Sequence, residues 1–270
     1  MTTVQTLKPL RYRSIWLSDV HLGYRGCKAD FLLDFLKATE SDVLYLVGDI
    51  VDLWSMKRTM YWPQSHNNVI RTILGKAKHG TRIIYIPGNH DEQLREYIGS
   101  VFGIVEVHDE YVHVNPDGRR FLILHGDIYD AIMKCSGLKN LVGNKVYDLI
   151  MYLNRHVYKW RQAFGFPYWS LASFLKCRVK DAVKHIRKYE EIVAADAKHR
   201  GFDGVICGHI HHAGIREVDG ITYCNDGDWV ENCTAMVETK DGQLEILHWS
   251  EKREILHSTQ AGQLQSPVAA

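Results

Sequence analysis

Aspartate, asparagine and histidine residues recur in five short motifs along the chain. A set of carboxylate and amide oxygens combined with imidazole nitrogens suits divalent first-row metal ions and not a thiolate zinc site. Any one motif alone is more typical of a turn or a helix cap, but together they predict a metal centre. In order, the motifs are Asp19-Val20-His21, Gly48-Asp49, Gly88-Asn89-His90-Asp91, His125-Gly126-Asp127 and Gly208-His209-Ile210-His211.

A short apolar run precedes each motif, and this run must position it. The runs are rich in Ile, Val, Leu and Tyr, and most of them end at Gly or Pro, as is typical of strands buried on both faces. Ligands in α/β sheets collect beyond the carboxyl ends of the strands. We therefore expect the five motifs to form one shared site. The runs are residues 14–17, 43–47, 82–86, 121–124 and 205–207.

In this order the motifs resemble those of the calcineurin-like metallophosphoesterases, over roughly residues 13 to 230. The resemblance implies an α/β (α+β) fold, a four-layer sandwich of two mixed β-sheets flanked by helices, with a helical cap insertion. It implies two divalent metal ions as cofactors, with manganese expected first and iron or zinc as alternatives. The ligands would be Asp19, His21, Asp49 and His211 for one ion, and Asp49, Asn89, His125 and His209 for the second, with Asp49 as the bridge.

Other residues of the motifs receive catalytic or supporting roles. By the same resemblance His90 is not a ligand but faces the phosphate, where an imidazole near neutrality stabilises charge or protonates the leaving oxygen. Asp91 is expected to orient that imidazole, so His90 and Asp91 are the predicted catalytic residues. Asp127 is expected to hold a ligand imidazole, and Asp52 is interpreted as a helix cap.

Residues 48–54, Gly-Asp-Ile-Val-Asp-Leu-Trp, resemble the G-D-x-x-D/E-x-W stretch of the UDP-2,3-diacylglucosamine pyrophosphatases. This resemblance implies hydrolysis of a UDP-diacylglucosamine-like nucleotide lipid diphosphate to UMP and an acylated sugar 1-phosphate, in lipid A biosynthesis. Asn89, His90 and Trp54 would bind the substrate. Well-known members have Arg where this chain has His90, and the two side chains present different geometry and charge to a diphosphate.

Two alternatives to that function stay open. One is a paralogue that hydrolyses another phosphodiester or a phosphomonoester. The other is a non-catalytic protein-binding scaffold on the same fold. A scaffold would be expected to lose metal ligands, whereas all seven candidate ligands and His90 are present, which favours an enzyme.

Helical and turn signals connect the runs. Apolar residues at helical spacing predict helices over 29–39 and 68–78, and this alternation of strands and helices predicts a largely parallel sheet. Turn residues at 115–118, 219–220 and 241–242 predict three hairpins, so the carboxyl half is expected to be antiparallel or mixed. His66, His79 and His185 are expected on the solvated surface, while His212 is either structural or a spare imidazole.

We expect one metallophosphoesterase domain over 11–256, a helical cap inserted within it at 130–200, and a disordered tail at 257–270. Helices are expected over 142–160, 170–176 and 179–197. Residues 130–188 contain twelve Lys or Arg against three Asp. This insertion is either an ordinary helical segment with solvated basic residues or a cap that receives acyl chains and anionic headgroups. No recognised nucleic-acid motif accompanies it, so no nucleic-acid partner is expected.

Composition limits the remaining classes. With 270 residues, 46% of them hydrophobic, the chain can bury one substantial core with an elaboration. Six cysteines without C-x-x-C spacing predict a reduced, cytosolic protein, with Cys207 inside a buried strand. The first ten residues lack an apolar signal region, and no run approaches the roughly 18 apolar residues of a spanning helix. The predicted location is the cytoplasm, with peripheral attachment to the inner membrane face as a hypothesis.

Overall fold

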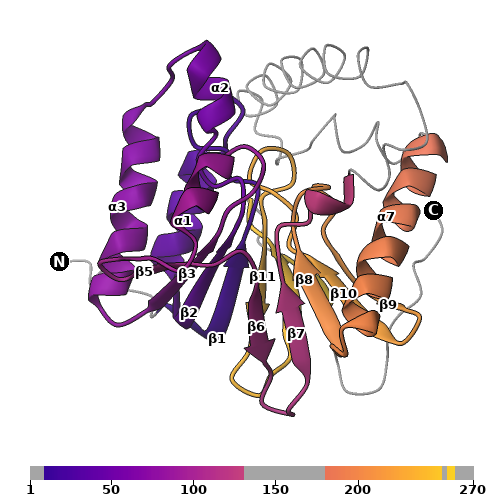
Figure 1. Cartoon of the computed structure of the whole chain (residues 1–270). Helices are drawn as coiled ribbons and strands as arrows, with labels where there is room; N and C mark the ends of the chain where they lie inside the picture. Colours follow the sequence, from indigo (N-terminus) through magenta and orange to yellow (C-terminus); the bar gives the residue numbers. More distant parts are fainter. Residues whose placement is uncertain (1–8, 131–179, 251–253, 259–270) are drawn as a thin grey trace.

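Two β-sheets stacked between helices form the body of the protein in the computed structural model (Figure 1), which describes residues 9–130, 180–250 and 254–258. Within these residues the first sheet has the strand order β13-β12-β11-β1-β2-β3-β5-β4, and the second has the order β6-β7-β8-β10-β9. The strands of the first sheet are β1 (Leu10–Leu17), β2 (Thr39–Val47), β3 (Arg82–Ile86), β4 (Val101–Phe102), β5 (Val105–Val107), β11 (Thr234–Glu238), β12 (Leu244–His248) and β13 (Glu254–Ser258). Those of the second are β6 (Tyr111–Val114), β7 (Arg120–Ile123), β8 (Gly204–Cys207), β9 (Gly214–Val218) and β10 (Ile221–Asn225).

Helices cover the outer face of each sheet. Alternate residues of one strand point to opposite faces, so Ile15 and Leu17 pack toward α1 and α3, whereas Trp16 lies between the sheets and stacks on Tyr45 at 5.2 Å. On the second sheet, α7 packs on β8, β9 and β10. The expected four-layer sandwich is therefore confirmed. The helices are α1 (Ala29–Ala38), α2 (Leu53–Arg58), α3 (Gln64–Lys78), the 3-10 helix η1 (Glu92–Tyr97) and α7 (Lys180–His199).

Strand direction gathers the loops that carry the motifs. Strands β1, β2 and β3 are mutually parallel, as are β7 and β8. The three predicted hairpins are confirmed as the antiparallel pairs β6–β7, β9–β10 and β11–β12. The carboxyl ends of the parallel strands from both sheets meet at the top of Figure 1, where α2 also stands.

Several expectations need correction. His66 is buried rather than solvated, and its Nδ1 accepts a hydrogen bond of 2.9 Å from the backbone N–H of Gly23. His257 and Ser258 are not part of a disordered tail, because they belong to β13 and pair with Ile246 and Glu245 of β12. The short strands β4 and β5 were not predicted. His79 and His185 are exposed as expected.

The predicted insertion is partly outside the described residues. The helices expected over 142–160 and 170–176 lie there, as do residues 259–270. The helix expected over 179–197 is confirmed as α7, but it packs as a layer on the second sheet and does not belong to a cap. Tyr189, Val193 and Ala197 of α7 are buried against that sheet. No helix in the described part of the chain is long and apolar enough to cross a membrane.

A core substitution tests this layer arrangement. Phe35 of α1 is fully buried, with its ring 5.4 Å from that of Trp229 and 5.2 Å from that of Trp249. Phe35→Ala should lower the free energy of unfolding by about 3–5 kcal/mol, because it removes buried contacts and leaves a cavity. Phe102→Ala, at an exposed position on β4, should change it by less than about 1 kcal/mol. Equal losses in urea denaturation of the two variants would contradict the layer assignment.

Candidate metal centre

The motif residues occupy the loops that leave the strands. Asp19 and His21 follow β1, Asp49 follows β2, and His209 and His211 follow β8. The first two loops continue the parallel pairing of their strands, since the N–H of His21 donates to the carbonyl of Asp49 at 2.8 Å. Asp19 and Asp49 are thereby held side by side and almost fully buried.

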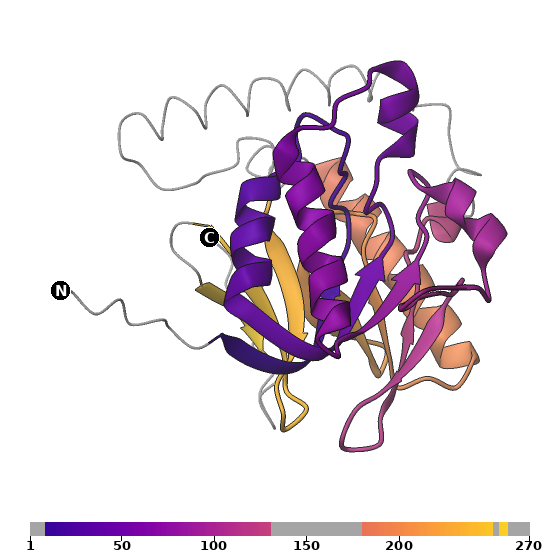
Figure 2. The same ribbon diagram turned by 90° about the vertical axis from the view of Figure 1, so that its left-hand side faces the viewer.

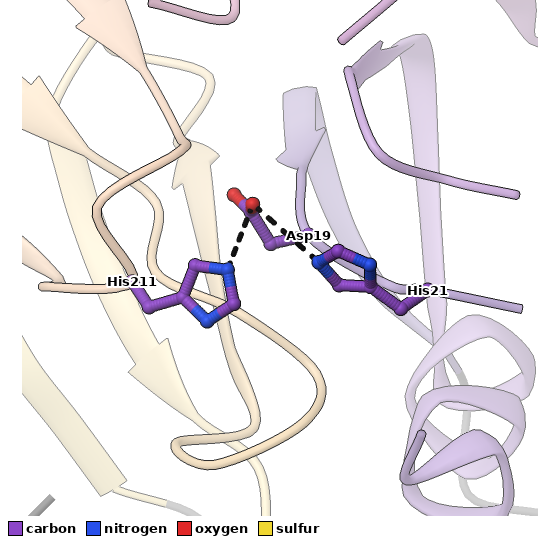
Figure 3. A group of neighbouring side chains, drawn as sticks. All are labelled: Asp19, His21 and His211. Carbon is purple, nitrogen blue, oxygen red and sulfur yellow. Dashed lines mark ion pairs between the residues drawn. The ribbon is translucent and has the colours of Figure 1, made fainter. Parts of the chain in front are cut away.

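Three overlapping groups of side chains have potential ligand atoms within 4.8 Å of one another. In the first, Asp19 Oδ1 lies 3.0 Å from His211 Nε2 and 3.9 Å from His21 Nε2 (Figure 3). In another, His125 Nε2 lies 3.4 Å from Asp49 Oδ2. The groups share Asp19, Asp49 and His21, so they form one continuous cluster. They are Asp19, His21 and His211; Asp19, Asp49 and His125; and His21, Asp49 and His90.

The hydrogen bonding of the cluster indicates that its side chains can bind metal ions. His21 Nε2, Asn89 Oδ1 and His125 Nε2 are buried, and none of them makes a hydrogen bond of acceptable geometry within the described part of the chain. Buried polar atoms without partners are costly and rare. All three belong to the predicted ligand set, and a bound cation would satisfy them.

Fixed hydrogen bonds orient the imidazole rings. Asp52 accepts from His21 Nδ1 at 3.1 Å and from His90 Nδ1 at 3.0 Å. His125 Nδ1 lies 2.8 Å from the carbonyl oxygen of Val47. Because these oxygens only accept, each ring carries its proton on Nδ1 and directs Nε2 toward the cluster. This is the arrangement that metal-binding histidines commonly have.

Charge couples the carboxylates and imidazoles of the cluster. Burial alone would raise the pKa values of the Asp19 and Asp49 carboxyl groups, but the neighbouring imidazoles outweigh it and lower both pKa values below the usual range. Burial disfavours the charged form of His21, but Asp52, Asp49 and Asp19 together raise its pKa to about 9. The carboxylates therefore remain ionised inside the protein and require positive charge beside them.

The backbone is unusual at the candidate ligands. Positive φ values, which are uncommon outside glycine, occur at Asp19, His21, Asp49, His209 and His211, between 50° and 69°. Gly48, just before Asp49, has a φ of 80°, and a Cβ there would overlap the ring of His125. Such conformations concentrate at functional sites, where the surrounding structure enforces them.

Two predicted ligands lie beside the cluster: His209, which is outside the three groups, and Asn89, an amide, which is not among the residue types that form them. The backbone N–H of His209 donates to Asp19 Oδ2 at 2.8 Å, and its ring centroid is 5.2 Å from that of His125. Its Nε2 is 3.2 Å from Asp130 Oδ2. Asn89 follows Gly88, where a Cβ would overlap Asp49 and His125. Both roles as ligands remain predictions.

The expected pairing of Asp91 with the imidazole of His90 is wrong. The buried Asp91 carboxylate instead accepts from the backbone N–H groups of Ile50 at 2.9 Å and Gly88 at 2.7 Å, and from the Tyr85 hydroxyl. It thus ties the loop after β2 to the loop after β3. The expected role of Asp127 is also wrong, because its carboxylate pairs with Arg95 at 2.8 Å and not with a ligand imidazole.

Two supporting carboxylates were not recognised from the sequence as parts of the site. Asp52 does cap α2, accepting from the Ser55 N–H at 2.7 Å, but it also holds both imidazoles. Ser18 Oγ lies 2.6 Å from both Asp19 Oδ2 and Asp226 Oδ1. The Ser18 hydroxyl thus links the two carboxyl groups, and burial raises the pKa of Asp226 well above its usual value. The position of Asp226 directly after the buried strand β10 is the sequence feature that could have identified it as part of the site.

Asp91 offers a test of how the loops are held. Asp91→Asn keeps the size of the side chain but replaces one of the two acceptor oxygens that serve several backbone N–H groups. We expect the free energy of unfolding to fall by about 2–4 kcal/mol and Mn²⁺ affinity to weaken, as measured by urea denaturation and calorimetric titration. Asp117→Asn, at an exposed turn, should leave both unchanged. An Asp91→Asn protein as stable as the parent would contradict the loop-clamping role.

Comparison with known proteins agrees with this site. The family model described as Calcineurin-like phosphoesterase matches residues 12–213. The UDP-2,3-diacylglucosamine hydrolase of Psychromonas ingrahamii is 25% identical over 240 residues, covering 85% of this chain and 94% of that protein.

Other relatives match over shorter lengths. The Porphyromonas gingivalis protein of the same name is 26% identical over 125 residues, 44% of this chain and 47% of its own, so the chain spans about half of that relative. The DNA polymerase II small subunit of Methanothermobacter thermautotrophicus is 29% identical over 180 residues, 53% of this chain and 36% of that protein. Since the family match covers most of the chain and includes the whole cluster, the chain belongs to the calcineurin-like phosphoesterases.

Proposed function

We propose that this protein hydrolyses a UDP-diacylglucosamine-like nucleotide lipid diphosphate to UMP and an acylated sugar 1-phosphate, in lipid A biosynthesis. The observation that carries the hydrolytic chemistry is the continuous cluster in which Asp19, Asp49 and His21 are shared between potential ligand groups. The choice of substrate is supported by the hydrolase names of the relatives, including one aligned over 94% of its length.

Two divalent ions are the proposed cofactors, with manganese first. When bound, such ions neutralise phosphoryl oxygens and make water a stronger nucleophile near neutral pH. The protein's part is to keep the donor atoms in place before substrate arrives. The residues proposed to hold the ions are Asp19, His21, Asp49 and His211 for one, and Asp49, Asn89, His125 and His209 for the other.

His90 is the proposed proton donor to the leaving oxygen. The Asp52 carboxylate accepts from His90 Nδ1 at 3.0 Å, and the backbone N–H of His90 donates to Asp49 Oδ1 at 2.7 Å. These two bonds fix the His90 ring with Nε2 toward the cluster. Its side chain is about one quarter exposed, which leaves room for a substrate. The Trp54 ring lies 5.6 Å from His90, edge to face, and is proposed to contact the substrate together with Asn89.

The alternative with a specific observation behind it is a paralogue that hydrolyses another phosphodiester or a phosphomonoester. His90 stands where the well-known pyrophosphatases have Arg, and the Asp52–His90 pair suits protonation of an alcohol leaving group.

We place the protein in the cytoplasm, attached peripherally to the inner face of the membrane, where a lipid-linked substrate would lie.

The substrate test uses Mn²⁺-loaded protein with UDP-2,3-diacylglucosamine, and bis-p-nitrophenyl phosphate in parallel. We expect UMP to form, and an Asp49→Asn variant to lose most of both activities because it lacks the shared carboxylate. UMP is quantified by chromatography. Turnover of the simple diester without UMP would favour the paralogue. No turnover with any divalent ion would favour a non-catalytic scaffold.

A second test isolates the role of His90. His90→Gln should lower kcat for an alkyl diester of UMP about 100-fold or more, because the leaving alkoxide oxygen loses its proton donor. For bis-p-nitrophenyl phosphate, whose leaving group needs no proton, kcat should fall by less than about tenfold. His79→Gln, exposed on α3, serves as the matched control. Equal losses for both substrates would contradict proton donation.

A further inference from the structure

A protruding apolar surface lies beside the metal centre. Helix α2 contains no buried residue, and Figures 1 and 2 both show it standing above the upper ends of α1 and α3. Three large side chains on and after it are solvent-exposed: Trp54 by 50%, Met60 by 73% and Trp62 by 37%. We call the segment Leu53 to Trp62 the α2 lip.

Charge within the α2 lip has one sign. Lys57 and Arg58 are exposed within it. No Asp or Glu occurs anywhere from residue 53 to residue 90, a stretch that holds six Lys or Arg. Arg25, from the loop after β1, adds a further cation, with its guanidinium 4.7 Å from the centre of the Tyr61 ring. A partner for this surface must therefore be both anionic and able to accept apolar side chains.

The residues between 131 and 179 of the chain itself do not meet that requirement. They contain eight Lys or Arg and a single acidic residue. Like charges at close range repel, so this segment is a poor occupant for a cationic lip. An external anionic partner fits the charge better.

The aromatic rings indicate which anionic partner fits. The Arg58 guanidinium lies 4.7 Å from the Trp54 ring centre, and Trp62 meets His66 edge to face at 5.6 Å. Single-stranded nucleic acids are bound by stacking bases on open ring faces, whereas the Arg58 guanidinium already lies over the Trp54 ring. Exposed Trp and Met beside Lys and Arg are instead typical of segments that lie in the interface of a bilayer.

We propose that the α2 lip docks on the surface of an anionic lipid bilayer, with Met60 and Trp62 in the headgroup region and Lys57, Arg58 and Arg25 facing lipid phosphates. Such segments enter a membrane by roughly 5–10 Å. Since Trp54 contacts His90, docking brings the metal centre to the headgroups. The inference deepens the proposed function by assigning the surface from which a lipid-linked substrate is reached.

Vesicle binding tests the proposal without any substrate. Full-length protein is co-sedimented with vesicles of mixed phosphatidylglycerol and phosphatidylcholine, and with vesicles of phosphatidylcholine alone. We expect binding to the anionic vesicles only. The variant Lys57→Glu/Met60→Ser should weaken that binding about tenfold or more, because it reverses one charge and removes one inserted side chain. Neither residue belongs to the proposed site, so turnover of bis-p-nitrophenyl phosphate should be unchanged and reports a folded protein.

The matched control is Leu74→Ser/Lys78→Glu, which makes the same kinds of change at exposed positions on α3 and should bind vesicles like the parent. Equal binding by both double variants, or no binding by the parent, would overturn the proposal. Binding of a labelled single-stranded oligonucleotide that the α2 lip variant loses, with no vesicle binding, would overturn it in favour of nucleic acid. Failure of UMP formation with intact vesicle binding would count only against the proposed substrate.

Discussion

The pairing of two loops beyond the ends of β1 and β2 is the constraint on which the site depends. The N–H of Leu22 donates to the carbonyl of Ile50 at 2.9 Å, and the N–H of Asp52 donates to the carbonyl of Leu22 at 2.7 Å. These bonds extend the parallel ladder past the strands, so Asp19 and Asp49 cannot move apart. Two buried carboxylates at fixed separation repel unless cations neutralise them, and this accounts for the imidazoles gathered around them.

Holding the site in this form costs conformational energy. Left-handed backbone at a residue other than glycine costs of order 1–3 kcal/mol, and five of the seven predicted ligands adopt it. The surrounding sandwich offsets this cost through three buried clusters, one between the sheets and one on the outer face of each. Rigid sheets therefore do more than display the ligands, because they keep in place loops that would relax in isolation.

The sequence predicted which loops form the site, but not the hydrogen-bond partners of the side chains in those loops. Apolar runs that stop at Asp, Asn or His predicted the strands and brought Asp19, Asp49 and His125 to one place, because strand direction alone decides where such residues gather. The partners of Asp91 in the loop after β2 were not predictable, since they are backbone groups some forty positions earlier whose path the sequence does not specify. The prediction that His66 lies on the surface was wrong for a similar reason, because its burial depends on where the loop at Gly23 passes.

One connection in the second sheet has an evolutionary consequence. Parallel strands β7 and β8 require a crossover, and α7 provides it. Asp130 lies beside the metal centre, with Oδ2 3.2 Å from His209 Nε2, and α7 begins at the upper end of the second sheet in Figure 1. Sequence and length between these anchor points can diverge without disturbing a single strand. The crossover is thus free to change at a different rate from the strands in descendants of this fold.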